Sequence, residues 1–256
     1  MIHPTAIIHP KAVIGSETKV GAYSVIGENV TLGQGCEIQE HVVITGHTVI
    51  GNQVRMFPGV VVGSEPQHLQ YRGEPTTTVI GNNVTLRECV TVHRGTPIGI
   101  NTTIIADNCF IMAYSHVAHD CVIGKNIIIA NNVQLAGHVE LEDHVIIGGQ
   151  SAIAQFCRVG RNCYVGGGSI LRKDLPPFLV GKGNDFKVQG INQVGLSRQG
   201  FSSESLQQLK TLFKIFYMQK LTVNQAIEKI SAEVALSEPI SHFIQFVKKS
   251  KTGFIR

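Results

Sequence analysis

Apolar residues stand at every sixth position along much of the chain. The spacing is unbroken over residues 2–62, returns over 80–98 and, shifted by one residue, runs over 105–171. In most repeats the position two residues earlier is small or β-branched, and side chains two apart on a strand face the same way. The pattern predicts short strands that alternate with turns and wind into a parallel β-helix of triangular section, with about 18 residues in each coil of three repeats.

The cysteines follow the same repeat. None of the six belongs to a Cys-x-x-Cys pair, and a reducing compartment seldom permits disulfides. We therefore interpret those in the small-residue position as buried apolar side chains, not as metal ligands. They are Cys36, Cys109, Cys121, Cys157 and Cys163.

Two segments interrupt the repeat. Residues 64–78 keep its frame but are polar and contain two prolines, which predicts a loop that projects from the prism and is placed to carry function. Near residues 99–101 the frame slips, and we interpret the slip as a one-residue insertion. The repeat ends after about residue 185, so we expect a β-helix domain over 1–185 and a helical domain over 186–256.

Three amphipathic helices are predicted in the second domain. The first opens at residues 201–204, the second at a capping box formed by Thr222 and Gln225, and the third near Pro239. We expect this domain to cover the open end of the prism.

Composition adds little. The net charge of +4 is too small to indicate nucleic-acid binding but is compatible with an acidic protein partner. No apolar run approaches the roughly 20 residues of a membrane span, and the N-terminal residues lack the layout of a signal peptide. We expect a cytoplasmic protein.

The stretch AYSHVAHDCVIG, residues 113–124, holds the most informative polar side chains. Residues one coil apart stack like neighbouring strands, about 4.8 Å from one another. His119 should therefore lie over Gly137, and Asp120 beside His138. The resulting polar edge of the prism is predicted to hold His116, His119, Asp120, His138, His144 and Gln155.

Three interpretations of this edge are open. Three imidazoles with a vacant position would make a catalytic zinc site, as in a zinc carbonic anhydrase built on such a prism, although His116 and His119 should lie on different surfaces of one strand segment. The histidines are alternatively plain surface residues. In the third interpretation His119 is a general base, and the backbone N–H of Gly137 polarises a thioester carbonyl. His144, one repeat after His138, is expected to support rather than react.

Several longer stretches resemble one family. SHVAHDC (115–121), ANNVQLAGHV (130–139), DLPPF (174–178), GINQVGLSRQGF (190–201) and the final TGFIR are similar to the UDP-N-acetylglucosamine O-acyltransferases, members of the hexapeptide-repeat transferases. The resemblance extends over essentially the whole chain. It implies a left-handed winding, a homotrimer with active sites between neighbouring prisms, and no cofactor. The implied reaction is the first step of lipid A synthesis, in which acyl carrier protein donates a (R)-3-hydroxyacyl chain to the glucosamine 3-position of UDP-N-acetylglucosamine.

The resemblance also assigns roles to individual residues. It makes His119 the general base, with Asp120 beside it, and makes the amide of Gly137 the binder of the thioester carbonyl. Gly167 matches the position that measures acyl length, where glycine leaves the groove open for a longer chain; a simple corner glycine is the alternative. Positions expected to contact or border the substrates are Gln67, His68, Leu69, His93, His116, Asn131, His138, Gln155, Asn192 and Arg198. For Arg198 the alternative is a solvated charge at a helix.

Departures from the family pattern concern the acceptor. The family usually has Asp at the place of His68, often Lys at Gln70, and usually His at Ala154. Val194 and Gln199 replace a Glu and an Arg of the nucleotide segment. The 3-amino analogue of the sugar, which would give an amide, is therefore an alternative acceptor.

Other classes of protein also fit parts of the pattern. A related hexapeptide transferase would be an N-acyltransferase of the same pathway or would use acetyl-CoA, and a non-enzymatic β-helix would be a scaffold. In the leading interpretation an acidic carrier protein would meet basic residues near the helical domain, which are Arg161, Arg172 and Lys173.

Overall fold

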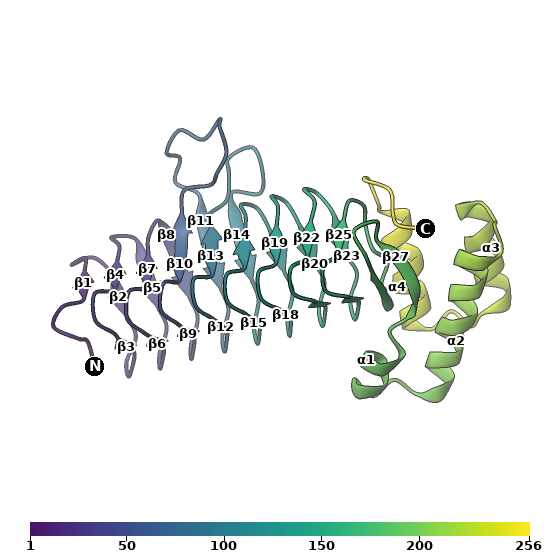
Figure 1. Ribbon diagram of the computed structural model, residues 1–256, viewed down its shortest axis with the longest axis horizontal. Coiled ribbons are helices and arrows are strands. Elements are labelled where there is room, and N and C mark those ends of the chain that lie inside the picture. Colours follow the sequence, from purple (N-terminus) through teal and green to yellow (C-terminus); the bar gives the residue numbers. More distant parts are fainter.

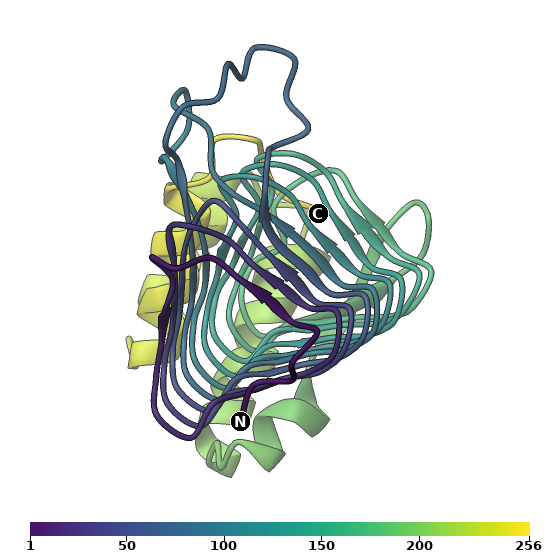
Figure 2. The same ribbon diagram turned by 90° about the vertical axis from the view of Figure 1, so that its left-hand side faces the viewer.

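The computed structural model describes all 256 residues and shows a long prism followed by helices (Figure 1). Viewed along its axis, the prism has a triangular outline formed by three flat sheets (Figure 2). The first sheet contains β1 (Ile7–Ile8), β4 (Val25–Ile26), β7 (Val43–Ile44), β10 (Val61–Ser64), β13 (Thr91–His93), β16 (His116–Val117), β19 (Gln134–Leu135), β22 (Ala152–Ile153) and β25 (Ile170–Leu171).

The other two sheets repeat this arrangement. The second contains β2 (Val13–Ile14), β5 (Val30–Leu32), β8 (His47–Ile50), β11 (Thr77–Ile80), β14 (Thr102–Ile105), β17 (Val122–Ile123), β20 (Glu140–Leu141) and β23 (Arg158–Val159). The third contains β3 (Lys19–Val20), β6 (Glu37–Ile38), β9 (Arg55–Met56), β12 (Thr85–Leu86), β15 (Phe110–Ile111), β18 (Ile128–Ile129), β21 (Ile146–Ile147), β24 (Tyr164–Val165), β26 (Leu179–Lys182) and β27 (Lys187–Ile191).

The coil length confirms the prediction. His116 pairs in parallel with Gln134, and Gln134 with Ala152, and the ladder repeats along the prism at a separation of 18 residues. The inward positions of successive coils form one apolar column in which side chains such as Val117 and Leu135 are fully buried. The five cysteines of the repeat are buried in this column, as predicted, whereas Cys89 is exposed.

The corners of the prism have their own rule. At most of the turns, one residue adopts a left-handed backbone conformation. Examples are Asp120, His138 and His144, where φ is near 60°. Asparagine is frequent there, as at Asn126 and Asn132, because its side chain tolerates this region better than most. Cys89 occupies such a corner, which explains why it alone among the cysteines lies outside the core.

Both interruptions of the repeat are loops that leave the prism at neighbouring coils (Figure 1). Strands on either side of the loop at 64–78 pair at a separation of 30 residues, a multiple of six, so the loop keeps the six-residue frame as predicted. The frame slip at 99–101 was predicted as a one-residue insertion, and this is wrong: strands across it pair at a separation of 25 rather than 18 residues. Ile98, which fits the six-residue spacing, is 64% exposed and belongs to this loop.

The chain ends in helices beside the last coils (Figure 1). They are α1 (Gln193–Arg198), α2 (Ser203–Phe213) with its π-helical extension η1 (Lys214–Met218), α3 (Val223–Glu233) and α4 (Glu238–Lys248). The three predicted helices and the capping box of Thr222 and Gln225 are confirmed. The antiparallel pairing of β26 with β27 and the short helix α1 were not predicted.

Polar and aromatic contacts attach the helices to the prism. Arg158 lies over the ring of Phe246 at 4.2 Å, and Nε2 of His242 lies 2.7 Å from a carboxylate oxygen of Glu142. None of these helices has the length and apolar character needed to cross a membrane.

Candidate active site

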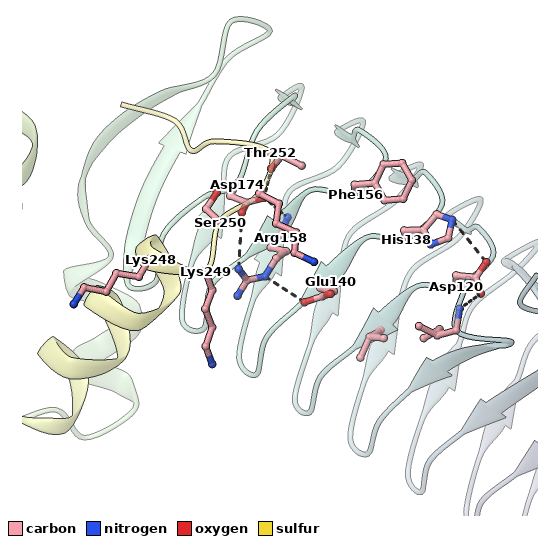
Figure 3. Close-up of a pocket in the computed structure, with 13 residues that line it drawn as sticks. Asp120, His138, Glu140, Phe156, Arg158, Asp174, Lys248, Lys249, Ser250 and Thr252 are labelled. Atoms are coloured by element: carbon pink, nitrogen blue, oxygen red, sulfur yellow. Dashed lines mark hydrogen bonds and ion pairs between the residues drawn. The ribbon is translucent and has the colours of Figure 1, made fainter. Parts of the chain in front are cut away.

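The polar residues gather on one corner of the prism, between the first and second sheets. We call this corner the histidine ridge; on successive coils it carries His119–Asp120, Gly137–His138 and Gln155–Phe156. Backbone N–H groups join the coils: that of His138 donates to His119, and that of Phe156 donates to Gly137. Figure 3 shows Asp120, His138 and Phe156 following one another along the ridge. The predicted stacking of His119 on Gly137 is therefore present.

His119 and Asp120 form a hydrogen-bonded pair. Nδ1 of His119 lies 2.9 Å from Oδ2 of Asp120, whose side chain is fully buried. Burial alone would favour the neutral acid, but hydrogen bonds from His119 and Thr96 outweigh it and lower the pKa of Asp120. The ionised carboxylate accepts a hydrogen bond from the N–H at Nδ1, which fixes the tautomer of His119 and leaves Nε2 as an acceptor.

Nε2 of His119 faces Gly137 across a very short gap. A Cβ atom added to Gly137 would lie 2.8 Å from Nε2 and 2.6 Å from Cε1. Only glycine leaves the ring in place at this position, so the close approach is the reason for glycine here. The backbone N–H of Gly137 has no backbone acceptor, whereas the N–H groups of Ala136 and His138 on either side of it are paired with carbonyls.

Other histidine rings surround the pair. The rings of His68 and His138 contact His119 edge to face, at centroid distances of 5.4 and 5.1 Å. His138 in turn stacks on Phe156, with 4.6 Å between ring centroids. His68 belongs to the projecting loop at residues 64–78, so this loop reaches the ridge.

Burial keeps several of these rings uncharged. It lowers the pKa of His116 to about 4, and it lowers the pKa of His93, whose ring lies 4.7 Å from that of His116. The pKa of His138 is also lowered by burial, although the charge of Asp120 opposes the shift. At neutral pH these imidazoles therefore act as hydrogen-bonding groups, as His116 does with Oγ1 of Thr91 at 2.7 Å.

A groove of about 490 Å³ runs along the first sheet up to the ridge. His116 and His119 both line it, so the expectation that they lie on different surfaces is wrong; a short strand ending at a sharp corner lets both rings reach one face. The other lining residues are Gln67, Ala118, Gln134, Leu135, Ala136, Gly137, Ala152, Ile153, Ala154, Gln155, Ile170 and Arg172.

A metal site was the competing interpretation. Ligand atoms of His119, Asp120 and His138 do lie within 4.8 Å of one another. The carboxylate of Asp120, however, already accepts hydrogen bonds from Nδ1 of His119, from Thr96 and from the N–H of Ile100. The oxygens of Asp120 are therefore occupied by hydrogen bonds, and the carboxylate orients the ring of His119 instead of presenting a free metal ligand.

Not every predicted site residue meets the groove. Asn131 and Gly167 lie on the opposite corner of the first sheet, where Gly149 separates them. Asn192 caps α1, accepting a hydrogen bond from Gly195. Leu69, Val194, Arg198 and Gln199 are exposed, and His144 lies on the next corner of its coil.

Arg161 differs from its expected role as a carrier contact. Its guanidinium pairs with Glu238 of α4 and lies 5.2 Å from the ring of Phe178, so it holds the helices to the prism. Arg172 and Lys173 are exposed.

A second and larger groove, of about 990 Å³, lies on the other side of the ridge (Figure 3). It was not predicted, because it is formed where the end of α4 lies next to the second sheet, a contact between segments far apart in the sequence. Arg158 lies at its centre and contacts Glu140 at 3.2 Å. The remaining lining residues are Ile100, Asp120, Val122, His138, Phe156, Asp174, Lys248, Lys249, Ser250, Lys251 and Thr252.

Two curated proteins similar to this chain carry the same name. Acyl-[acyl-carrier-protein]--UDP-N-acetylglucosamine O-acyltransferase of Anaeromyxobacter sp. is 44% identical over 82% of this chain and 81% of that protein. The protein of the same name from Thermodesulfovibrio yellowstonii is 46% identical over the same shares. The chain belongs to the UDP-N-acetylglucosamine O-acyltransferase family. The resemblance seen in its sequence is thus confirmed.

Family models agree with this assignment. The model described as Udp N-acetylglucosamine O-acyltransferase, domain 2, matches residues 174–255, and the bacterial transferase hexapeptide model matches 102–137. A model of the GMPPB C-terminal domain matches residues 2–102.

Solved structures of UDP-N-acetylglucosamine acyltransferases superpose closely on this chain. LpxA from Acinetobacter baumannii is 41% identical with a TM-score of 0.97, covering 100% of this chain and 99% of that chain. LpxA of Bacteroides fragilis, a UDP-N-acetylglucosamine acyltransferase, is 37% identical with a TM-score of 0.97, covering 100% of both chains. The left-handed parallel β-helix with a small C-terminal helical part is therefore confirmed for this acyltransferase.

Proposed function

We propose that this chain transfers a (R)-3-hydroxyacyl group from acyl carrier protein to the glucosamine 3-position of UDP-N-acetylglucosamine, the first step of lipid A synthesis. The observation that carries the proposal is the pairing of His119 with Asp120 beside Gly137. This pairing leaves Nε2 as a proton acceptor at the end of an open groove.

The chemistry follows from this geometry. Nε2 of His119 takes the proton of the 3-hydroxyl as that oxygen attacks the thioester carbon. The negative charge that develops on the carbonyl oxygen is stabilised by the N–H of Gly137, which has no backbone acceptor of its own. When the C–S bond breaks, the imidazolium of His119 returns the proton to the departing thiolate of the carrier. Asp120 stabilises the imidazolium between the two proton transfers.

The groove is open on a single chain, whereas acyl transfer from a thioester must exclude water. We infer a homotrimer in which a neighbouring prism supplies the missing wall, and a cytoplasmic enzyme that needs no cofactor. Such a neighbour also gives Asn192 and Arg198 a means of reaching the nucleotide across the subunit boundary, since neither lies in the groove of its own chain.

The acceptor is the finer part of the proposal. Ala154 lines the groove and His68 contacts His119, so these two of the five departures from the family pattern lie where a sugar would bind. UDP-N-acetylglucosamine and its 3-amino analogue differ only at the attacking atom, and the general base serves either.

The test is an assay of the purified protein with 3-hydroxyacyl carrier proteins of several lengths against both sugars. We expect transfer to UDP-N-acetylglucosamine that exceeds transfer to the amino sugar, and a trimeric mass by light scattering. Faster transfer to the 3-amino analogue would make that sugar, instead of UDP-N-acetylglucosamine, the acceptor. No transfer to either sugar would overturn the proposed function.

A further inference from the structure

The loop between β13 and β14 folds back onto the histidine ridge. It extends this coil, so that paired strands across it are 25 rather than 18 residues apart, and the separation returns to 18 residues in the next coil. The family chemistry proposed above does not use this loop. Its contacts with Asp120 indicate what it does.

Three of these contacts are hydrogen bonds to the carboxylate of Asp120. The hydroxyl of Thr96 donates to Oδ2 at 2.6 Å, and its backbone N–H lies 3.1 Å from both oxygens. The N–H of Ile100 donates to Oδ1 at 3.0 Å. Thr96 is fully buried, and Nδ1 of His119 completes the set of donors around the carboxylate.

Gly99 closes the loop over the same group. A Cβ atom on Gly99 would lie 2.3 Å from Cγ of Asp120 and about as close to both oxygens, so no larger residue fits without moving the carboxylate. Oγ1 of Thr103 accepts a hydrogen bond from the backbone N–H of Asp120 at 2.8 Å. Asp120 is thereby fixed at its backbone and at both oxygens.

We propose that Thr96 is a positioning residue for the general base. It acts through Asp120 and never touches substrate, and the inserted loop is the element that delivers it. The inference rests on the proposed function, because it assigns to Thr96 the control of a base that the function requires. A carboxylate hydrogen-bonded to both Thr96 and His119 shares its charge between them, and this sharing sets how strongly the imidazolium is held.

Removing the hydroxyl therefore has a defined direction. With one donor fewer, the carboxylate places more of its charge on His119 and holds the imidazolium more strongly. The orientation of the ring is also less restrained. The other titratable rings around His119 are those of His68 and His138 in contact with it, and those of His93 and His116 farther away.

The experiment compares Thr96→Val, Thr96→Ser and Gly99→Ala in the full-length protein. Thr96→Val is expected to lower kcat about tenfold, to change KM for either substrate less than about twofold, and to move the acidic limb of the pH profile to higher pH by about half a unit. Thr96→Ser should restore most of the turnover and the original profile. Gly99→Ala should lower kcat at least as far as Thr96→Val, because it displaces the carboxylate itself.

Thr78→Val is the matched control. Thr78 is also fully buried, it pairs with Thr103 in the neighbouring strand, and its hydroxyl has no hydrogen-bond partner. Its loss should leave kcat and the pH profile unchanged. Circular dichroism and thermal melting verify that each variant is folded.

The two hypotheses fail in different ways. The titration of the His119 ring, followed by NMR in the wild type and in Thr96→Val, requires no turnover and tests the link between Thr96 and His119 directly. An unchanged titration, or a loss of turnover without any change in the pH profile, would overturn the role of Thr96. Full turnover in His119→Ala would instead overturn the proposed function.

Discussion

Nε2 of His119 lies so close to the α-carbon of Gly137 that a methyl group placed there would sit 2.8 Å from the nitrogen. Gly137→Ala is therefore expected to push the imidazole out of position and lower kcat about a hundredfold while the fold is retained. Gly190→Ala is the control, since a Cβ atom at residue 190 meets nothing within 4 Å. The measurement is kcat of Gly137→Ala and of Gly190→Ala from steady-state kinetics. Equal turnover in the two variants would contradict the proposed contact between His119 and residue 137.

His119→Ala should lower kcat at least a hundredfold, because it removes the general base that takes the proton from the acceptor hydroxyl. The comparison variant is His144→Ala, one repeat beyond the ridge on the next corner, where turnover should stay near that of the wild type. Size-exclusion chromatography of both variants should show the same assembly as the wild type. Near-normal turnover in His119→Ala would remove the mechanism.

Asp120→Asn should reduce kcat by a factor of a hundred or more with little change in KM. The amide cannot stabilise the imidazolium, and it can present N–H to Nδ1 and so favour the wrong tautomer. The measurement is single-turnover acyl transfer with saturating sugar. A variant that loses affinity for sugar but keeps its rate of transfer would show that Asp120 binds substrate instead.

Acidification should destabilise the protein through His116. Its pKa in the folded protein is about 4, below the ordinary value of 6.5, because the ring is buried. Between these two values the unfolded chain binds more protons than the folded one, so stability falls as pH decreases from about 6.5 to about 4. Asp120, whose pKa is lowered, loses its own contribution only at more acidic pH.

The measurement is the melting temperature of the wild type and of His116→Gln at pH values across this window. The variant should show a flatter dependence, because one buried group that resists protonation has been removed. Parallel curves for the two proteins would show that His116 does not contribute.

Gly167→Met should shorten the acyl chain that the enzyme prefers, if the corner that Gly167 shares with Gly149 ends the acyl groove. A Cβ atom at residue 167 would lie 3.1 Å from the carbonyl oxygen of Gly149, a tight contact that requires a small shift of the neighbouring backbone. Competition between carrier proteins loaded with chains of different length measures the preference. An unchanged preference would discard this assignment.

Much of the fold could be predicted because the β-helix repeats one local rule. The inward position of each repeat is apolar, so spacing alone gave the coil length, and with it the stacking of His119 on Gly137. The capping box at Thr222 likewise has a local signature. These features depend on residues near one another in sequence or separated by a constant interval.

The parts that could not be predicted depend on contacts without a fixed interval. Ile98 fits the six-residue spacing by coincidence, so the spacing did not indicate the true length of its loop. The hydrogen bond from Thr96 to Asp120 could not be predicted either, because the loop that carries Thr96 interrupts the repeat. The ion pair of Arg161 with Glu238 could not be predicted, because nothing in the sequence places these residues side by side. The groove at the end of α4 depends on the same kind of contact.

Each coil of the prism bonds only to the coil above and the coil below, and two unequal loops leave neighbouring coils without disturbing the ladder on either side. Segments can therefore be spliced into a corner with little cost to the rest of the molecule. Evolution of such a scaffold can lengthen, shorten or exchange its corner loops one at a time. A new donor, lid or recognition segment is then acquired by a local change of chain length, while the stack that aligns the reacting groups is inherited intact.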